Sequence, residues 1–397
     1  MRYVLIAIPT FVAYFEATMI VASIPTVARE LSVSPSTANL LILVYVLVEV
    51  LFFVPMAFLV ERIGLRTSFL IGGTVLGVGG LLIPLTMQVD GILILRAIQG
   101  VGASLILPST LAYASLLDKD AERGKAVGFI ATAVGLGYGL GLPIGGLLAV
   151  LGWKYLFVLS SLVVLCVVPL AGALPQVRQK SRLEREVIGP TILLSGVMLS
   201  FVDFWIGLGL ASAGLVLALV VRFAGSFTKG SLAGFLHSMS RSAATIFLVL
   251  FYTSRGFSPI EAGLLSFIFP LSFVIAAFVS GSFSDHFGLG KLSFVMFTLT
   301  AIASLLFLPG FLWMVIFSSV ILGAASGIAT TANTAWTMNH LPPHQRVVGA
   351  ALRTMQGATS LATGLELGSL AFPGVLGVVA LISLPNVLAA LVSGSYR

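Results

Sequence analysis

Several ionisable residues interrupt stretches of the sequence that are otherwise apolar. Five of them are candidates for function: Glu16, Glu49, Arg96, Arg241 and Arg353. At the centre of a lipid bilayer a charged side chain costs at least ~2.5–3.5 kcal/mol, so it is rarely kept without a partner or a task. Burial disfavours the ionised form of a carboxyl group, whereas a nearby arginine favours it, so a carboxyl under both influences can load and release a proton. We predict that these residues carry protons or line a small-molecule cavity; static ion pairs are the alternative, above all for Glu49.

The overall composition shows what surrounds these charges. Of 397 residues, 58% are hydrophobic and 9% are charged, and the mean hydropathy is +1.12. Soluble proteins carry roughly 25% charged residues. Apolar runs of about 20 residues recur along the chain, each long enough to cross a hydrocarbon core as a helix. The sequence therefore predicts an all-α polytopic membrane protein rather than a barrel of short alternating strands.

The net charge of +7 and the single cysteine exclude two further classes of protein. Basic residues lie in short connecting loops and not on one helix face, so no nucleic-acid partner is expected. Cys166 lies alone in an apolar run, so there is no disulfide framework.

Fourteen membrane spans are predicted from the apolar runs. Residues 188–223 are too long for one crossing, so we place a tight hairpin there that turns near Asp203. The spans are 3–28, 38–60, 66–87, 92–117, 124–150, 154–174, 188–203, 208–223, 232–254, 260–284, 291–308, 311–337, 346–371 and 374–392.

The distribution of Lys and Arg predicts the orientation of these spans. With the N-terminus in the cytoplasm, most basic residues fall in inside loops, and the outside loops hold only Arg29, Lys154 and Arg255. This is the bias that the positive-inside rule requires. We expect a multi-pass protein of the cytoplasmic membrane with both termini in the cytoplasm. His237 is expected at the cytoplasmic interface.

An internal repeat relates the two ends of the chain. The segment AFLVERIGLR (57–66) recurs in outline as SGSFSDHFGLGK (280–291), which places Asp285 on Glu61. Gly323 matches Gly100, and Arg346 matches Arg123, at nearly the same offset. We predict an N-terminal six-helix bundle over 1–175, a linker with an extra helix hairpin over 176–224, and a C-terminal six-helix bundle over 225–397.

Four motifs resemble those of the major facilitator superfamily, and specifically of its fourteen-helix drug:proton antiporter branch. AFLVERIGLR (57–66) is similar to the loop signature G-x-L-A-D-R-x-G-R-K, and RAIQGVGAS (96–104) is similar to R-x-x-Q-G-x-G-A. FEATMIVASIP (15–25) resembles the first-helix element L-D-x-T-x-x-N-x-A-L-P. The glycine spacing of the antiporter element recurs, although its proline is displaced by one place to Pro143; the glycines are Gly128, Gly137, Gly141, Gly145 and Gly146.

This resemblance implies a role for each motif. Glu16 occupies the acidic position of the first helix, and Arg96 resembles the proton-relay arginine, with Gln99 beside it. The loop residues Glu61, Arg62 and Arg66, with Asp285 in the second half, are expected to form a cytoplasmic gate; ordinary interfacial charges are the alternative. The glycines are expected to form a close interface between the bundles, although glycine is common in membrane helices generally.

Several signatures of other functions are absent from the sequence. There is no G-x-x-x-x-G-K-[ST] loop for ATP, no metal-ligand spacing of His or Cys, and no G-x-S-x-G elbow. We therefore expect no enzyme activity, no cofactor and no metal, and a monomer in the lipid bilayer with protons and a small molecule as its partners. The predicted function is proton-coupled export of small amphipathic compounds. Two alternatives stay open: proton-linked uptake of an organic anion, with Arg241 and Arg353 as its counter-ions, and a transport-inactive sensor or scaffold.

Overall fold

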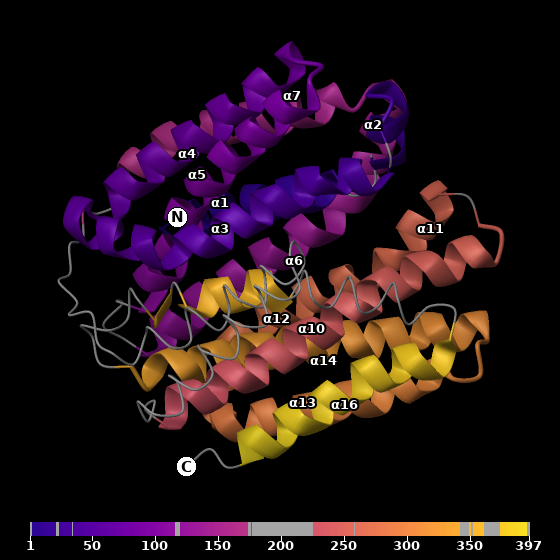
Figure 1. Ribbon diagram of the computed structural model, residues 1–397. Helices are drawn as coiled ribbons and strands as arrows, with labels where there is room; N and C mark the ends of the chain where they lie inside the picture. Colours follow the sequence, from indigo (N-terminus) through magenta and orange to yellow (C-terminus); the bar gives the residue numbers. More distant parts are fainter. Residues whose placement is uncertain are drawn as a thin grey trace, which may run out of the picture. The chain divides into compact units, whose positions relative to one another are not determined.

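The described part of the chain is helical throughout in the computed structural model (Figure 1). The structure describes residues 2–20, 24–33, 35–115, 120–173, 176, 225–257, 259–341, 349–350, 352–360 and 374–394. The first group of helices is α1 (Arg2–Met19), α2 (Ile24–Glu30), α3 (Pro35–Ile63), α4 (Leu65–Leu82), α5 (Val89–Ser115), α6 (Asp120–Leu151) and α7 (Lys154–Val167). The second group is α10 (Gly225–Ser254), α11 (Pro259–Ser266), α12 (Ile268–Phe287), α13 (Leu289–Ser304), α14 (Leu312–Asn339) and α16 (Val375–Gly394). Short 3-10 turns extend three of them: η2 (Ile83–Leu85), η3 (Val168–Ala173) and η4 (Leu305–Phe307).

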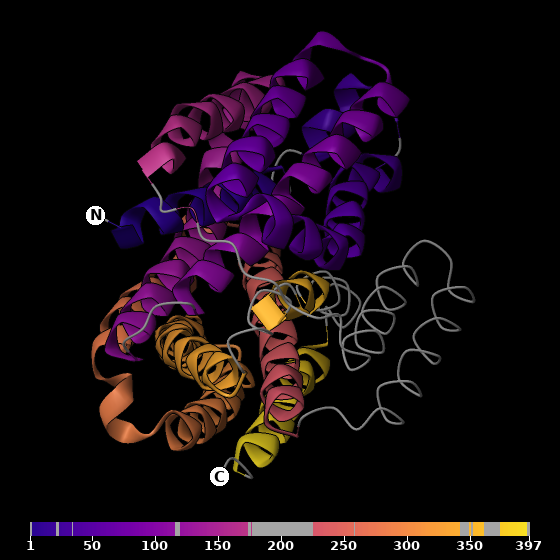
Figure 2. The ribbon, with the colours of Figure 1, turned by 90° about the vertical axis from the view of Figure 1, so that its left-hand side faces the viewer.

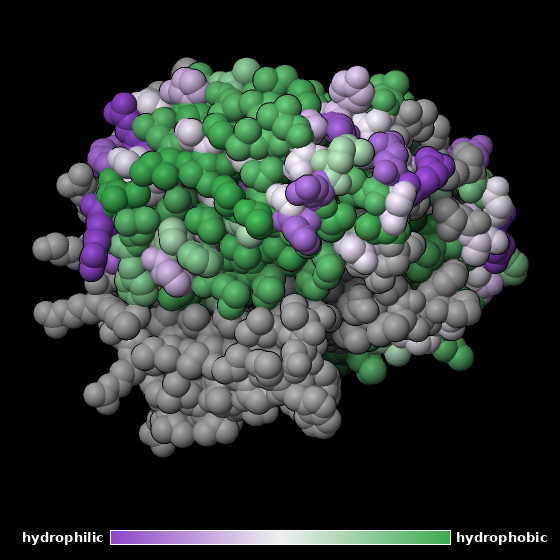
Figure 3. Space-filling view, turned by 45° about the horizontal axis from the view of Figure 1, so that its top comes forward, coloured by the Kyte–Doolittle hydropathy of each residue, from purple (hydrophilic) through white to green (hydrophobic). Residues whose placement is uncertain are grey.

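Many of these helices have the length and composition of membrane spans. Within the described residues, 9 helices are long and apolar enough to cross a bilayer, such as Leu40–Ile63 with a mean hydropathy of 2.6. Large apolar side chains also point outward, for example Leu82, Ile94 and Leu162. Figure 3 shows one face on which hydrophobic residues form a broad area, with hydrophilic residues mainly toward its edges. The prediction of a polytopic helical membrane protein is confirmed.

The described helices fall into two compact units. The first holds α1 to α5, α7 and the end of α6 from Leu140 onward. Within it α7 packs along α1 and α4, and α2 packs on α3. Trp153, which directly precedes α7, and Phe157 of α7 are buried there, together with Phe15 and Met19 of α1. Glu16 lies between Phe15 and Met19 in the sequence, so the packing of this core determines which residues surround it.

The second unit holds α10 to α14, α16 and the start of α6 up to Gly139. Here α14 packs against α12 and α13, and α16 packs against α10 and α13. Figure 2 shows α10 and α16 side by side. The rings of Phe247 and Phe307 lie 5.0 Å apart in its core.

The predicted spans agree with most of these helices, with two exceptions. The span predicted over 3–28 contains two helices, α1 and α2, and Pro25 lies in the first turn of α2, where a missing N–H group is tolerated. The span predicted over 260–284 is present as one membrane-spanning segment, Glu261–Ser280, but its helix is interrupted at Phe267 into α11 and α12. Pro270 has no N–H group for the carbonyl of Ser266, so one hydrogen bond of the helix cannot form at this point.

Part of the predicted span count lies outside the described residues. The spans 188–203 and 208–223, with Asp203 between them, fall wholly there, and the span 346–371 falls there in part. Arg123 is on α6, whereas Arg346 is not described. The count of fourteen therefore stays a prediction.

Glycines at matching positions of the predicted repeat have similar surroundings in the two units. Gly64 separates α3 from α4 with φ 87°, and Gly288 separates α12 from α13 with φ 75°, a region that favours glycine. A Cβ atom on Gly100 would lie 2.6 Å from the carbonyl oxygen of Tyr45 on α3. A Cβ atom on Gly323 would likewise collide with the carbonyl oxygen of Phe269 on α12. Each glycine thus lets its helix approach the backbone of a neighbour.

These close approaches predict opposite effects of one substitution at different glycines. Gly100→Ala and Gly323→Ala should each destabilise the protein by about 1–3 kcal/mol, because the added methyl meets rigid backbone. Gly263→Ala is the control, because nothing lies within 4 Å of its Cβ position, and alanine favours a helix by about 0.5–1 kcal/mol over glycine. The measurement is the thermal unfolding midpoint of each variant in one detergent. Equal midpoints for Gly100→Ala and Gly263→Ala would contradict the packing described.

Candidate functional site

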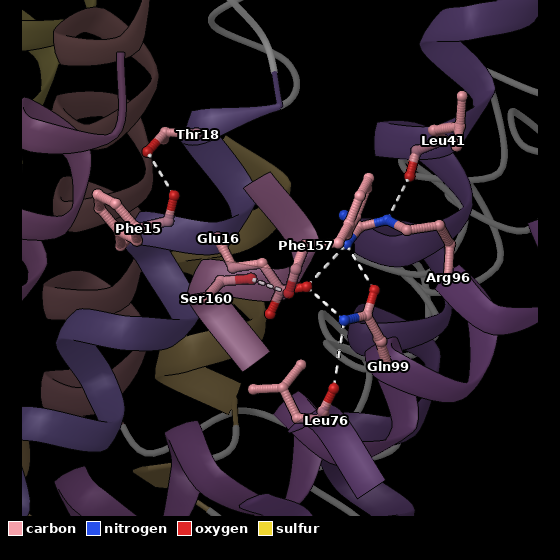
Figure 4. A network of polar contacts seen from close by, with 9 residues as sticks. All are labelled: Phe15, Glu16, Thr18, Leu41, Leu76, Arg96, Gln99, Phe157 and Ser160. Carbon is pink, nitrogen blue, oxygen red and sulfur yellow. Dashed lines mark hydrogen bonds and ion pairs between the residues drawn. The ribbon is translucent and has the colours of Figure 1, made fainter. Parts of the chain in front are cut away.

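A buried ion pair joins α1 to α5 in the first unit. The Arg96 Nη1 atom donates to the Glu16 carboxylate over 3.1 Å, and the two side chains are 0% and 1% exposed. Figure 4 shows both side chains turned toward each other, with Gln99 beside them. The structure therefore brings together Glu16, Arg96 and Gln99, which the sequence predicted as separate motif positions.

Gln99 completes this network. Its amide oxygen accepts from Arg96 Nη1 at 2.8 Å, and its amide nitrogen donates to Glu16 and, at 3.2 Å, to the carbonyl of Leu76. Space for this amide comes from α4, because a Cβ atom on Gly80 would lie 2.7 Å from Gln99 Nε2. The sequence analysis missed Gly80; its only signal was a glycine pair in an apolar helix.

Arg96 is also held by contacts outside the carboxylate. Its Nε atom donates to the carbonyl of Leu41 on α3 at 2.8 Å. The guanidinium carbon lies 4.2 Å from the centre of the Tyr45 ring and 5.6 Å from that of Phe157. Removing one partner of such a buried pair typically costs about 3–5 kcal/mol, because the other charge stays buried without compensation.

Glu49 adds a second carboxyl group to this site. It lies on α3 and is 4% exposed, and its Oε1 atom has no hydrogen-bond partner among the described residues. It interacts electrostatically with both Arg96 and Glu16. The Tyr45 hydroxyl and Arg96 Nη2 are likewise buried without a hydrogen-bond partner in the described chain. Two carboxyl groups thus share one arginine, and a single bound proton would make the group electrically neutral.

Two of the predicted glycines of α6 position α1 at this site. A Cβ atom on Gly141 would lie 3.1 Å from the Met19 nitrogen, and one on Gly145 would collide with the Met19 backbone. The backbone of α1 is therefore held against α6 within one turn of Glu16.

The surroundings of the other predicted glycines are described in less detail. Gly128 is buried on α6, and Gly137 and Gly146 lie on the same helix. Two glycines outside the predicted set, Gly135 and Gly139, face α12, where Cβ atoms would meet Phe273 at 2.6 Å and Pro270 at 2.9 Å. The glycines of α6 therefore face at least two neighbouring helices.

The predicted gate residues lie around the turn between α3 and α4. Glu61 is buried and has an interaction partner, whereas Arg62 and Arg66 are exposed. Gln176, which the sequence analysis did not single out, donates to the Ile63 carbonyl at 2.7 Å and to Thr67 at 3.0 Å. Asp285 is on α12 shortly before its end; the surroundings of its side chain lie outside the description.

Arg241 and Arg353 lie on other helical segments than the residues of the Glu16 network. Arg353 is 8% exposed on the helical segment 352–360 and has an interaction partner. Arg241 is half-buried on α10, with its guanidinium carbon 5.3 Å from the Tyr138 ring centre and 5.2 Å from that of Phe273. Each such contact is worth about 0.5–2 kcal/mol.

His237, which is expected at the cytoplasmic interface, is enclosed by neighbouring helices. It is 1% exposed, and its Nδ1 atom lies 2.7 Å from the Asn386 side-chain oxygen. Its ring centre is 4.9 Å from that of Phe297. Near the end of a span, packing between α10 and α16 can enclose a residue that the sequence alone places at the interface.

The chemistry available at the Glu16 site is proton binding and ion pairing. No group of three or more His, Cys, Asp or Glu residues suited to a metal occurs in the portion of the chain that the structure describes. Three charged groups that meet in a hydrophobic core can exchange a proton, and they can respond to a charged ligand.

Comparisons with known proteins identify the family to which this chain belongs. A family model of the Major Facilitator Superfamily matches residues 6–231 and 230–395. The chain is 24% identical to the riboflavin transporter RibZ of Clostridioides difficile, over 91% of this chain and 85% of that protein. It is 27% identical to the tetracenomycin C resistance and export protein of Streptomyces glaucescens, over 75% of this chain but only 61% of the relative, so less than two thirds of that protein is spanned.

A solved structure shows the same fold at lower identity. The proton:xylose symporter XylE superposes with a TM-score of 0.76 and 15% identity, covering 99% of this chain and 94% of XylE. Because the family model matches nearly the whole chain and the helical fold agrees, this protein belongs to the Major Facilitator Superfamily, a family of membrane transporters.

Proposed function

We propose that this protein is a proton-coupled secondary transporter that exports small amphipathic compounds by alternating access. The observation that carries the proposal is the pair of buried carboxyl groups, Glu16 and Glu49, around the single arginine Arg96. A family relative named as a resistance and export protein supports the outward direction.

The charges of this site link proton binding to conformation. With one proton bound, the two carboxyl groups and Arg96 are together neutral, which suits a closed, dry core. Without that proton a net negative charge remains, and it is stabilised only where water or a cationic group can reach it. Proton loading therefore favours one conformational state over the other, which is the requirement for coupling.

Glu16 and Glu49 are suited to different parts of this task. Glu16 accepts hydrogen bonds from both Arg96 and Gln99, and these bonds favour its ionised form. Glu49 has no hydrogen bond within the described chain, so a proton on it breaks none. We assign the exchangeable proton to the pair, with Glu16 anchoring Arg96 and Glu49 taking up the proton.

The remaining parts of the proposal follow the predicted repeat. Bundles over 1–175 and 225–397 would rock about a midplane cavity, with a linker and helix pair over 176–224 as in the fourteen-helix antiporter branch. Both termini would lie in the cytoplasm, and the membrane would be the cytoplasmic one. The turns with Glu61, Arg62, Arg66 and Asp285 would close the cytoplasmic side, and the α6 glycines would let the bundles approach closely.

Uptake of an organic anion is the second candidate. The observation that favours it is Arg241, a half-buried cation on a membrane helix with no carboxylate partner among the described residues. Since an antiporter bringing protons in and a symporter both move protons inward, the direction of substrate movement must be followed to separate the two.

Glu16 is the first residue to test. Cells with the parent protein should accumulate less of some dyes in a panel of cationic and anionic fluorescent dyes than cells lacking it. Cells with Glu16→Gln should accumulate those dyes to the level of cells lacking the protein, because Arg96 loses its counter-ion. Glu30→Gln is the matched control, since Glu30 is exposed on α2. Full export by Glu16→Gln would remove Glu16 from coupling, and higher accumulation with the parent would favour uptake.

Glu49 is tested by separating exchange from proton-driven movement in proteoliposomes. For each proton exchanged, one pH unit supplies about 1.4 kcal/mol, enough for a tenfold substrate gradient. Glu49→Gln should still exchange labelled for unlabelled substrate but should build no gradient, because the neutral Arg96–Glu16 pair has no proton left to give. Asp90→Asn, which changes an exposed carboxylate on α5, should behave as the parent does. A pH-driven gradient built by Glu49→Gln would refute the assignment.

A further inference from the structure

Two arginines lie deep in described membrane helices, and their environments are opposite. Arg96 is 0% exposed and bonded to a carboxylate. Arg241 is half-buried, and within the described chain it has neither a salt bridge nor a side-chain hydrogen bond. Among the described residues, and apart from the hydrogen bonds of its own helix, Arg241 contacts two aromatic rings and, through its backbone carbonyl, the Thr245 hydroxyl at 3.0 Å.

The two rings beside Arg241 come from different helices. Tyr138 is on α6 and Phe273 is on α12, with ring centres 5.3 Å and 5.2 Å from the guanidinium carbon. The Phe273 ring fills the space that a side chain at Gly135 would need, since a Cβ atom there would lie 2.6 Å from it. Phe273 is itself 1% exposed, so its ring is fixed by packing and holds Arg241 in place, whereas the half-buried Tyr138 ring is the one that a ligand can reach.

Contacts with ring faces leave the hydrogen-bonding capacity of an arginine unused. A cation–π contact engages the positive charge, whereas the five N–H donors of the guanidinium lie in its plane and suit an oxyanion with two oxygens. None of these donors has an acceptor among the described residues. The site thus offers a positive charge, a fork of donors and flat apolar walls.

The position of Arg241 on its helix argues against lipid headgroups as the ligand. α10 runs from Gly225 to Ser254, so Arg241 is roughly 20 Å along the helix from the nearer end. A headgroup phosphate lies at the membrane surface, well outside the reach of an arginine side chain at this depth.

We propose that Arg241, Tyr138 and Phe273 bind the anionic end of a flat aromatic compound, such as an aromatic carboxylate. The carboxylate pairs with the donors of Arg241, which Phe273 holds in place, and the ring of the compound packs against the half-buried Tyr138 ring. This inference rests on the proposed function, because it assigns an anionic aromatic class to the transported compound.

The binding test compares three compounds that share one ring system. They are 2-naphthoate, the uncharged 2-naphthamide and the cationic 2-naphthylmethylammonium, titrated calorimetrically into the full-length protein in a non-ionic detergent. The acid should bind, and the amide and the ammonium compound should each bind at least about tenfold more weakly. Absence of naphthoate binding, or equal binding of the amide or the ammonium compound, would overturn the proposal.

Variants locate the binding at Arg241. Arg241→Gln should reduce naphthoate affinity at least about tenfold, and Arg241→Lys should fall between that variant and the parent, because a lysine keeps the charge but not the planar fork. Arg255→Gln is the matched control: Arg255 also contacts a ring, Phe251 at 5.0 Å, but donates to the Gly310 carbonyl at 2.7 Å. Unchanged affinity in Arg241→Gln, or an equal loss in Arg255→Gln, would place the ligand elsewhere.

Two features keep these outcomes interpretable. The unliganded unfolding midpoint of each variant shows whether it is folded, and the three-compound series on the parent protein needs no variant. Binding is measured without a proton gradient, so it is independent of coupling. Arg241-dependent naphthoate binding without proton-driven export would contradict the proposed function alone, whereas proton-driven export with no preference for the acid would contradict this site alone.

Discussion

The need to neutralise charge away from water governs the first unit of this protein. Glu16 and Arg96 are both buried, and Arg96 lies in a helix of membrane-spanning composition, so neither could remain ionised alone. Their pairing requires α1 and α5 to keep one relative position, and Gln99 ties the pair to the backbone of α4 through Leu76. Arg96 also holds α3 through the Leu41 carbonyl. One guanidinium therefore connects the helices that surround it, and any motion of these helices must act on its charge balance.

Glycines make this arrangement possible, because the charged groups can contact each other only where their helices pack closely together. Gly80 admits the amide of Gln99, and Gly141 and Gly145 allow α6 to press against the backbone of α1. Gly100 brings α5 against α3 beside Glu49, whose backbone nitrogen would lie 3.2 Å from an added Cβ atom. Small residues thus set the distances between charges, although they carry none.

The two units repeat this packing but not the chemistry. Gly323 approaches α12 as Gly100 approaches α3, and Gly288 forms the turn that Gly64 forms in the first unit. In place of a closed ion pair, the second unit has Arg241 between aromatic rings and the buried His237–Asn386 contact. Under the proposed function, the first unit would hold the coupling proton and the second would recognise the compound.

Much of the fold follows from the sequence, because the cost of placing a polar backbone in lipid leaves helices of about 20 residues as the main solution. For this reason the sequence predicts the positions of the helices from α3 to α7. It also predicts Glu16 and Arg96 as intramembrane charges. The break at Phe267 was missed, although Pro270 was its signal. Which charges meet is decided by tertiary structure alone: no spacing within one helix brings Glu16 to Gln99, and none distinguishes the enclosed Arg96 from the accessible Arg241. Pairing depends on the distances between helices, which side-chain packing at residues such as Gly80 and Gly145 sets, and those contacts join residues far apart in the chain.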